Sequence, residues 1–95
     1  MPDPHEAEPP YRLVLAPGAR RALTDKLPES AAFAAWEFIS GSLLARPRVV
    51  GTPLRNFEGL WRARRGEYRV RYRIVEERLE IQVLDIDHRR DAYHL

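Results

Sequence analysis

Side chains that can bind phosphates and move protons are concentrated in two stretches of this 95-residue chain. The first stretch, residues 60–75 (LWRARRGEYRVRYRIV), carries six arginines, and the second, residues 88–93 (HRRDAY), carries a histidine, two arginines and a tyrosine. Guanidinium groups pair with phosphate oxygens through two hydrogen bonds and remain charged at neutral pH. We therefore expect a polyanionic partner, with acid–base groups supplied by the second stretch.

The first stretch has the pattern of a β-hairpin whose two faces differ. Successive side chains of a strand point to opposite sides of a sheet, so residues 68–74 predict one apolar face and one face of arginines. Gly66 and its charged neighbours predict a hairpin turn, which adds Arg62 and Arg64 to the polar surface. The alternating residues are Tyr68, Val70, Tyr72 and Ile74 on one side and Arg69, Arg71 and Arg73 on the other. Arginines on an outer face are also often merely solvated, and that alternative stays open.

Charge is distributed unevenly along the chain. Residues 46–73 hold nine arginines against two glutamates, a balance of +7, whereas the whole chain has a formal net charge of +2. A local basic field of this kind steers polyanions better than the overall charge implies. Fifteen of the sixteen basic residues are arginine, so a bias of genomic base composition would also explain the residue type.

Several kinds of chemistry find no suitable residues here. The chain has no cysteine, which excludes disulfides, thiolate nucleophiles and cysteine zinc sites. Its histidines, His5, His88 and His94, are not spaced as a ligand set, and no phosphate-binding glycine loop or Ser–His–Asp set stands out. We therefore expect neither a metal nor a cofactor. No apolar run approaches the roughly 18 residues of a membrane span and no signal peptide is evident, so we expect a cytoplasmic protein.

One domain, residues 11–95, is predicted to position the two stretches. Residues 1–10 (MPDPHEAEPP) have four prolines, three acidic residues and no large apolar residue, which predicts a disordered tail. A short strand is predicted over residues 11–15, where apolar side chains alternate with others.

Two helices are expected next, over residues 18–26 and 29–45, because Pro17 suits a first helical position and Pro28 separates two apolar stripes. The second helix is predicted to bury one face, with Trp36 as a core residue. That face consists of Ala32, Trp36, Ile39 and Leu43, widened by Phe33 and Leu44.

The rest of the chain completes a sheet. Residues 46–59 are predicted to be a connection, because prolines and glycines interrupt them. The last strand, 79–86, is apolar on both sides, which is typical of a strand inside a sheet; one side carries Leu79, Ile81 and Val83, the other Leu84 and Ile86. The order of elements is an N-terminal strand, a two-helix hairpin and a three-stranded antiparallel meander. It predicts an α+β domain in which the strands form one sheet and the helices pack on one of its faces.

Four pieces of the sequence carry a resemblance through their order and spacing. They are Leu27-Pro28; Arg46-Pro47-Arg48 with Gly51 and Pro53-Leu54-Arg55; Trp61-Arg62-Ala63-Arg64 with Gly66, Tyr68-Arg69 and Tyr72-Arg73-Ile74; and Val83-Leu84 with Ile86, His88-Arg89-Arg90-Asp91 and Tyr93. Over residues 11–95 the chain resembles the RelE/ParE toxin superfamily, the small toxins of bacterial type II toxin–antitoxin pairs. The terminal HRRDxY favours the RelE branch and its fold.

The resemblance implies an endoribonuclease that cuts messenger RNA in the ribosomal A site without a metal. In such toxins the ribose 2′-hydroxyl attacks the adjacent phosphorus, leaving a 2′,3′-cyclic phosphate and a free 5′-hydroxyl, and translation and growth stop. The reaction needs a base, positive charge around the phosphorane and an acid for the leaving oxygen. The implied partners are the ribosome, its mRNA and a cognate RelB-like antitoxin, which forms a hetero-oligomer with the toxin and covers its apolar surface and basic face.

Carried over by the resemblance, the catalytic arginines are Arg62, Arg64, Arg69 and Arg89. The first-strand basic residues of well-known members are often lysines, which can lose a proton, whereas an arginine hardly can. These four residues are therefore assigned to charge stabilisation and substrate positioning. The arginines expected to contact RNA or the ribosome are Arg46, Arg48, Arg55, Arg65, Arg71 and Arg90.

Proton transfer is assigned to the remaining polar groups near the C-terminus. Histidine is the side-chain type best suited to acid–base work near neutral pH, which makes His88 a candidate. Tyr93, carried over by the resemblance, could stack on a base or move a proton, and Glu67 is a weaker candidate. Equally, His88 could hydrogen-bond to the C-terminal backbone, and Tyr93 could pack on the sheet.

Two other functions stay open. One is a ParE-like toxin of the same fold that inhibits DNA gyrase, and the other is a non-catalytic module that binds an antitoxin or RNA. An SOS response with trapped gyrase cleavage complexes and intact RNA would favour the first. Overexpression that leaves growth unchanged would favour the second.

Overall fold

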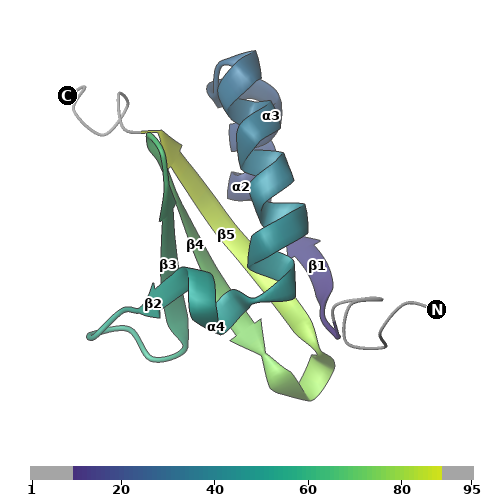
Figure 1. Ribbon diagram of the computed structural model, residues 1–95, viewed down its shortest axis with the longest axis vertical. Helices are drawn as coiled ribbons and strands as arrows, with labels where there is room; N and C mark the ends of the chain where they lie inside the picture. The colour runs from purple at the N-terminus through teal and green to yellow at the C-terminus, as the bar shows by residue number, and fades with distance from the viewer. Residues whose placement is uncertain (1–9, 89–95) are drawn as a thin grey trace.

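The structure, a computed structural model that describes residues 10–88, contains one five-stranded sheet with helices against one of its faces (Figure 1). The strand order is β1-β5-β4-β3-β2, with β1 parallel to β5 and every other pair antiparallel. The strands are β1 (Arg12–Leu15), β2 (Gly51–Pro53), β3 (Leu60–Arg65), β4 (Tyr68–Val75) and β5 (Glu80–His88). Residues 1–9 of the predicted tail lie outside the described part of the chain.

The α+β class is as predicted, but the sheet is larger than the predicted N-terminal strand and three-stranded meander. The meander is β3–β4–β5, and the predicted connection 46–59 supplies a further strand, β2, which pairs with β3. Just before it the chain forms a short helix, α4 (Pro47–Val50). Three residues are too few to show an alternation, and Pro53 is tolerated because β2 is an edge strand.

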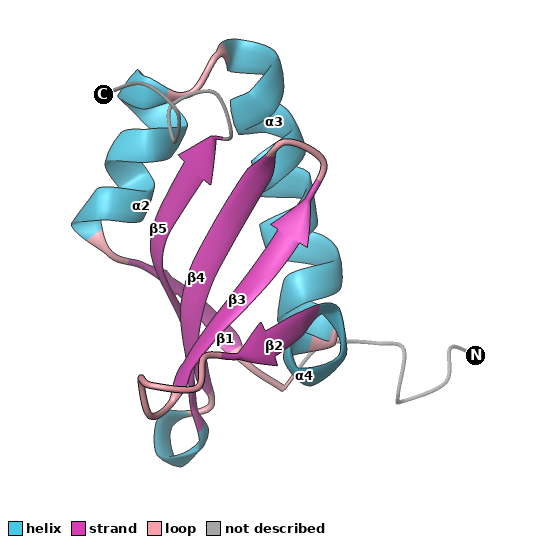
Figure 2. Ribbon diagram, turned by 90° about the vertical axis from the view of Figure 1, so that its left-hand side faces the viewer, coloured by secondary structure: helices cyan, strands magenta, loops and turns pink. Residues whose placement is uncertain are grey.

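The helices begin and end close to the predicted positions. Helix α2 (Pro17–Arg21) starts at Pro17 and continues as the π-helical turn η1 (Ala22–Lys26), and Leu27 then adopts an extended conformation with ψ 145°. Helix α3 (Glu29–Phe38) continues as the π-helical turn η2 (Ile39–Leu43). A single 3₁₀ turn, η3 (Glu76–Arg78), joins β4 to β5. Figure 2 looks onto the face of the sheet that α2 and α3 leave uncovered.

The buried face of the second helix differs from the prediction. Ile39 and Leu43 are fully buried, as expected, but Trp36 is 42% exposed and Phe33 is 65% exposed. Ala35 takes the central position, and the small side chain lets the helix lie close to the sheet. Apolar residues occupy more than one side of this helix, so its periodicity alone did not determine which side the sheet covers.

Strand β4 is fixed to the helical layer by its tyrosines. Tyr72 is fully buried, stacks on Trp61 and donates a hydrogen bond from its hydroxyl to the carbonyl of Pro47 at 2.6 Å. Tyr68 donates to the carbonyl of Ala34 at 3.0 Å. Burial raises the pKa of Tyr72 to about 12. Both phenols therefore pack as apolar groups while their hydroxyls remain satisfied.

A β-bulge in β5 reverses the predicted side of Ile86. Tyr72 pairs with Val83 and Arg71 pairs with Asp85, so Leu84 is an extra residue without a partner in β4. The extra residue shifts the alternation, and Ile86 is buried on the same side as Ile81 and Val83 instead of opposite them. The predicted first residue, Leu79, lies outside the strand in a left-handed turn with φ 52°.

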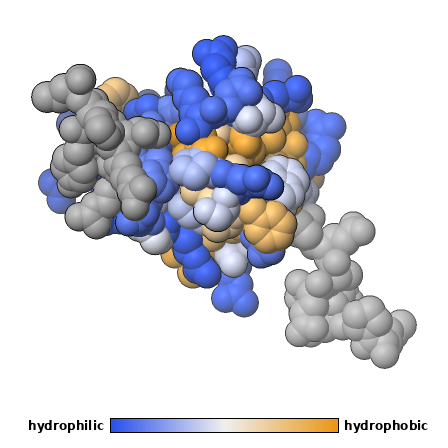
Figure 3. Space-filling model, turned by 90° about the horizontal axis from the view of Figure 1, so that it is seen from above, coloured by the Kyte–Doolittle hydropathy of each residue, from blue (hydrophilic) through white to orange (hydrophobic). Residues whose placement is uncertain are grey.

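The end of the molecule that carries the β3–β4 turn and the start of α3 is mainly hydrophilic. Seen from this end, hydrophilic residues surround a smaller hydrophobic area (Figure 3). Among residues 10–88 no helix is long and apolar enough to cross a membrane.

Candidate functional site

The uncovered face of the sheet carries a cluster of arginines from β3 and β4. In β4, Tyr68, Val70 and Tyr72 are buried beneath the helices while Arg69 and Arg71 point to the uncovered side, which confirms the predicted alternation. A turn in which Gly66 has φ 58° returns the chain from β3 to β4. The five arginines of the two strands on this side are Arg62, Arg64, Arg69, Arg71 and Arg73.

These arginines face one another across the hairpin. Arg62 is the register partner of Arg71, and Arg64 is the register partner of Arg69. Directly opposite side chains in an antiparallel pair have Cβ atoms about 4.5–5.5 Å apart, and like charges in that position destabilise the sheet. The folded chain therefore holds positive charge together at a cost in stability.

One of the five arginines is neutralised by a carboxylate on the neighbouring strand. The Nε of Arg71 donates to Oδ1 of Asp85 at 2.9 Å, and its second guanidinium nitrogen, Nη2, contacts Oδ2 of the same residue. This two-point contact is the geometry that matches guanidinium to carboxylate. The hydrogen bond to Asp85 is the main reason why the pKa of Arg71 is raised.

A hollow of about 250 Å³ opens between the arginines. It is lined by Arg62, Arg69 and Arg71, with Leu54 at its side and Asp87 as its acidic member. Asp87 is the register partner of Arg69 in the β4–β5 ladder. Three guanidinium groups around one hollow provide hydrogen-bond donors for a tetrahedral anion such as a phosphate.

The two proton-transfer candidates that the structure describes lie elsewhere. His88 is buried on the side of the sheet that faces the helices, opposite Tyr68 in the ladder. Its Nε2 lies 3.6 Å from Oε2 of Glu67 in the hairpin turn. Together with Tyr68 both residues line a separate hollow of about 330 Å³, whose other walls are Pro28, Ser30 and Ala31. The structure therefore does not bring His88 or Glu67 together with Arg62, Arg69 and Arg71.

The arginines predicted to contact RNA or the ribosome are dispersed. Arg71 lines the hollow, whereas Arg65 lies on the helical side with its guanidinium carbon 5.6 Å from the centre of the Phe38 ring. Arg46, which precedes α4 in the chain, and Arg55, which follows β2, are both exposed. Arg90 lies outside the described residues, as do the predicted catalytic residues Arg89 and Tyr93.

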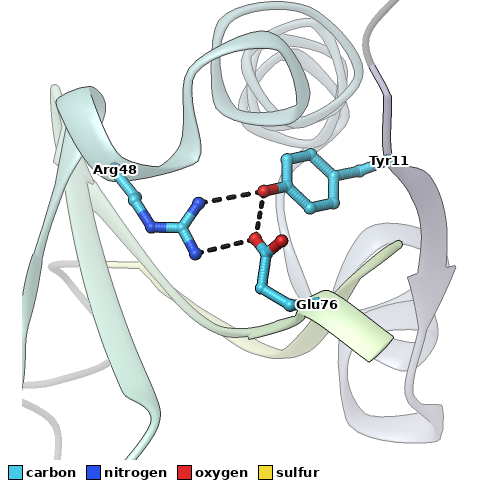
Figure 4. Close-up of polar contacts among 3 residues, drawn as sticks. All are labelled: Tyr11, Arg48 and Glu76. Atoms are coloured by element: carbon cyan, nitrogen blue, oxygen red, sulfur yellow. Dashed lines mark hydrogen bonds and ion pairs between the residues drawn. The ribbon is translucent and has the colours of Figure 1, made fainter. Parts of the chain in front are cut away.

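Arg48 belongs to a polar cluster that joins three distant segments (Figure 4). Its Nη1 donates to the hydroxyl of Tyr11 at 2.9 Å and its Nη2 to Oε1 of Glu76 at 2.7 Å, while Tyr11 donates to the same Glu76 oxygen. The hydrogen bond from Tyr11, followed by that from Arg48, lowers the pKa of Glu76. Arg48 thus connects α4 to the start of β1 and to the β4–β5 turn.

The acidic residues beside the arginine face were not predicted from the sequence. Asp85 and Asp87 are spaced two apart, which is the spacing of one strand face, and this signal was present in the sequence. Which face of the sheet these two aspartates occupy depends on the bulge at Leu84. No local sequence pattern predicts that bulge. Among residues 10–88 no group of histidine and acidic side chains is arranged to hold a metal ion.

The chain matches a known protein family and two curated toxins. Residues 15–93 match the family described as the ParE toxin of type II toxin–antitoxin system, parDE. The toxin RelE of Mycobacterium tuberculosis is 41% identical over 87 residues, which cover 90% of this chain and 89% of that protein. The toxin RelG of the same organism is 44% identical over 85 residues, covering 88% of this chain and 97% of that protein.

Solved structures agree with the sequence relatives. The toxin–antitoxin complex RelBE2 from M. tuberculosis contains a chain that matches with a TM-score of 0.77 and 44% identity, over 84% of this chain and 99% of that chain. The isolated Escherichia coli RelE toxin has the same fold, with a TM-score of 0.70 at 18% identity over 82% of this chain and 83% of that chain. The five-stranded sheet with its helices and arginine hairpin is thus a RelE-like fold, and the chain belongs to the ParE toxin family of type II toxin–antitoxin systems, in its RelE branch.

Proposed function

We propose that this toxin is a metal-independent endoribonuclease that cleaves messenger RNA on the ribosome and thereby inhibits translation and growth. The observation that carries the proposal is the hollow lined by Arg62, Arg69 and Arg71. The RelE resemblance implies the reaction, and the hollow supplies what that reaction requires most, which is fixed positive charge around a phosphate.

In the proposed mechanism the 2′-hydroxyl of the ribose attacks the adjacent phosphorus. Negative charge develops on the non-bridging oxygens, and Arg62 and Arg69 stabilise it from strands β3 and β4. Arg64 stands opposite Arg69 and extends the basic surface along the RNA backbone. Arg89 and Tyr93 complete the set that the resemblance implies. The opposed arginine pairs support this role, because a bound polyanion would relieve the like-charge repulsion across the hairpin.

The test uses ribosomes that are stalled on a defined message. Purified toxin is added, and the RNA ends are mapped and chemically typed. We expect cuts within the codon in the A site, with 2′,3′-cyclic phosphate and 5′-hydroxyl ends, and no change when divalent metal is varied within the range that keeps ribosomes intact. Translation that continues with an uncut message would overturn the proposal.

Inhibition of DNA gyrase is the second candidate, because the matching family is described by the ParE toxin. On that reading the arginine face would bind the gyrase–DNA complex and not a reacting phosphate. Trapped gyrase cleavage complexes and an SOS response in cells with intact messages would establish it. A chain that neither slows growth nor cuts RNA would instead be a non-catalytic binding module.

A RelB-like antitoxin is the proposed protein partner. The RelBE2 complex and the RelE–RelB complex of Pyrococcus horikoshii, which matches with a TM-score of 0.63 at 26% identity, are both toxin–antitoxin pairs. This chain leaves Phe33, Trp36 and Val49 exposed, which is apolar surface that a partner helix can cover. We expect the toxin to melt at a higher temperature when it is co-purified with the antitoxin encoded beside it. Equal melting temperatures of the free and paired toxin would contradict this expectation.

A further inference from the structure

We infer that Asp87 is the proton acceptor of the cleavage reaction, a role that rests on the proposed endoribonuclease function. The hollow holds Arg62, Arg69 and Arg71 together with one carboxylate, that of Asp87. Asp87 stands directly opposite Arg69 in the β4–β5 ladder, so a phosphate bound by Arg69 brings its ribose within reach of this carboxylate.

The reaction needs a base that the arginines cannot supply. A guanidinium does not lose its proton in a protein and therefore stabilises charge without accepting one. His88 and Glu67 lie on or beside the helix-covered side and line a different hollow. Among the side chains of residues 10–88 that line the arginine hollow, only Asp87 accepts a proton.

Asp85 is the nearest alternative proton acceptor, but it already pairs with an arginine. Both of its oxygens contact the guanidinium of Arg71, through Nε and Nη2. Asp87 is exposed, and no hydrogen bond within the described part of the chain holds its carboxylate. The two acids share a strand, a face and a charge, but only Asp85 makes the two-point contact with Arg71, whereas Asp87 acts on Arg71 through its charge alone. One acid fixes an arginine, and the other is available to substrate.

In the proposed step Asp87 acts as the base. The O–H bond of the ribose 2′-hydroxyl breaks as its proton passes to a carboxylate oxygen of Asp87, and the 2′-oxygen forms a bond to phosphorus. The bond between phosphorus and the 5′-oxygen then breaks, the leaving 5′-oxygen takes a proton from water, and the hydroxide that remains takes the proton from Asp87, which restores the carboxylate. Arg62 and Arg69 hold the non-bridging oxygens throughout, and no electrons are exchanged with a redox partner.

The experiment compares Asp87→Asn with Glu77→Gln in single-turnover cleavage of ribosome-bound message. Each change replaces a carboxylate by an amide of nearly the same shape. We expect Asp87→Asn to lower the maximal cleavage rate by about 10²–10⁴-fold, the usual contribution of a general base. The toxin concentration at half-maximal rate should stay equal or fall, because a negative charge has been removed from a basic site. Glu77→Gln removes the same charge from the β4–β5 turn, outside the hollow, and should keep the rate within the same order of magnitude.

The outcomes distinguish failure of the proposed function from failure of the role of Asp87. If the wild-type toxin does not cut, the endoribonuclease function fails and the role of Asp87 fails with it. If the wild-type toxin cuts and Asp87→Asn cuts at a similar rate, only the role of Asp87 is overturned. A rate lost equally in both variants would assign the effect to lost charge and also overturn it. Melting curves of all three proteins, and Asp87→Ser as a second variant, separate loss of the base from loss of the fold.

Discussion

The two faces of β4 show how one strand serves two opposite requirements. On the helical side Tyr68, Val70 and Tyr72 are buried, and each phenol donates a hydrogen bond to a backbone carbonyl. On the other side Arg69 and Arg71 are held opposite further arginines of β3. Packing and hydrogen bonds therefore fix the first face, whereas the second face retains repulsion.

The buried face stabilises the sheet, whereas the arginine face holds like charges opposite one another. Substitutions on the two faces should accordingly separate stability from activity. On the arginine face, activity should fall without loss of fold. On the buried face, the melting temperature should fall first.

Arg69→Ala should lower cleavage of ribosome-bound message by about 10²–10³-fold, since it removes one donor to the developing charge. Its melting temperature should be equal to or above that of the wild type, because the opposed Arg64 loses a like-charged neighbour. Arg73→Ala is the matched control, on the same strand and face but outside the hollow. If Arg69→Ala unfolds the protein, the arginine is structural, and stability and activity are not separated between the two faces of β4.

Gly51→Ala should destabilise the fold by about 1–3 kcal/mol, the usual cost of overpacking a filled site. A Cβ at this position would overlap the hydroxyl of Tyr72 and lie 2.9 Å from the carbonyl oxygen of Arg62. Denaturant unfolding measures the change. Gly41→Ala provides the control, because a Cβ there meets nothing within 4 Å and alanine favours a helix. Equal stability of the two variants would show that the contact between β2 and Tyr72 is loose.

Tyr72→Phe should cost about 1–2 kcal/mol at neutral pH, because the buried carbonyl of Pro47 loses its hydrogen-bond donor. The difference from the wild type should depend on pH. Burial raises the pKa of Tyr72 to about 12, so the unfolded chain releases the phenol proton at a lower pH than the folded protein does. The contribution of the neutral phenol is fully present below about pH 10 and is lost as the pH rises toward 12.

This pH dependence can be checked by measuring the free energy of unfolding of wild type and Tyr72→Phe at several pH values above neutrality. The gap between the two proteins should narrow across the alkaline range. A gap that stays constant would mean that the phenol is not buried in the folded state, and the buried face would then be less rigid than described.

The pair formed by Arg71 and Asp85 should show the smallest effect. Their side chains are 46% and 30% exposed, so solvent screens the attraction. A double-mutant cycle with Arg71→Ala and Asp85→Ala should give a coupling energy of about 0.2–1 kcal/mol, read from denaturant unfolding. A coupling of several kcal/mol would mean that this carboxylate, and not the buried face, holds the arginine side of the sheet in place.

Local sequence patterns were sufficient to predict the hairpin and the two helices. They failed where a structural feature depends on contact with a segment that is distant in the sequence. The alternation of residues 68–74 and the prolines at 17 and 28 were sufficient for the hairpin and the two helices. Trp36 was placed in the core because the helix is apolar on more than one side, and only the sheet selects which side is covered. Strand β2 was missed because a three-residue strand is defined by its pairing with β3.

The candidate site was predictable to a similar extent. The hairpin pattern alone indicated that Arg62, Arg64 and Arg69 share a face. The positions of Asp87 and His88 were not predictable in this way, because they depend on how β5 registers against β4. Arg89 and Tyr93 remain predictions from the resemblance to the RelE branch.

The unpaired Leu84 has a consequence beyond its own position. In a strand, odd- and even-numbered residues face opposite sides of the sheet. One additional residue therefore exchanges the two sides for all later residues of the strand. A chain shortened by one residue here would turn the histidine at its end outward among the guanidiniums and send the aspartate beside it into the interior. The bulge at Leu84, three residues before Asp87 and four before His88, therefore decides which of these two side chains lies beside the arginines.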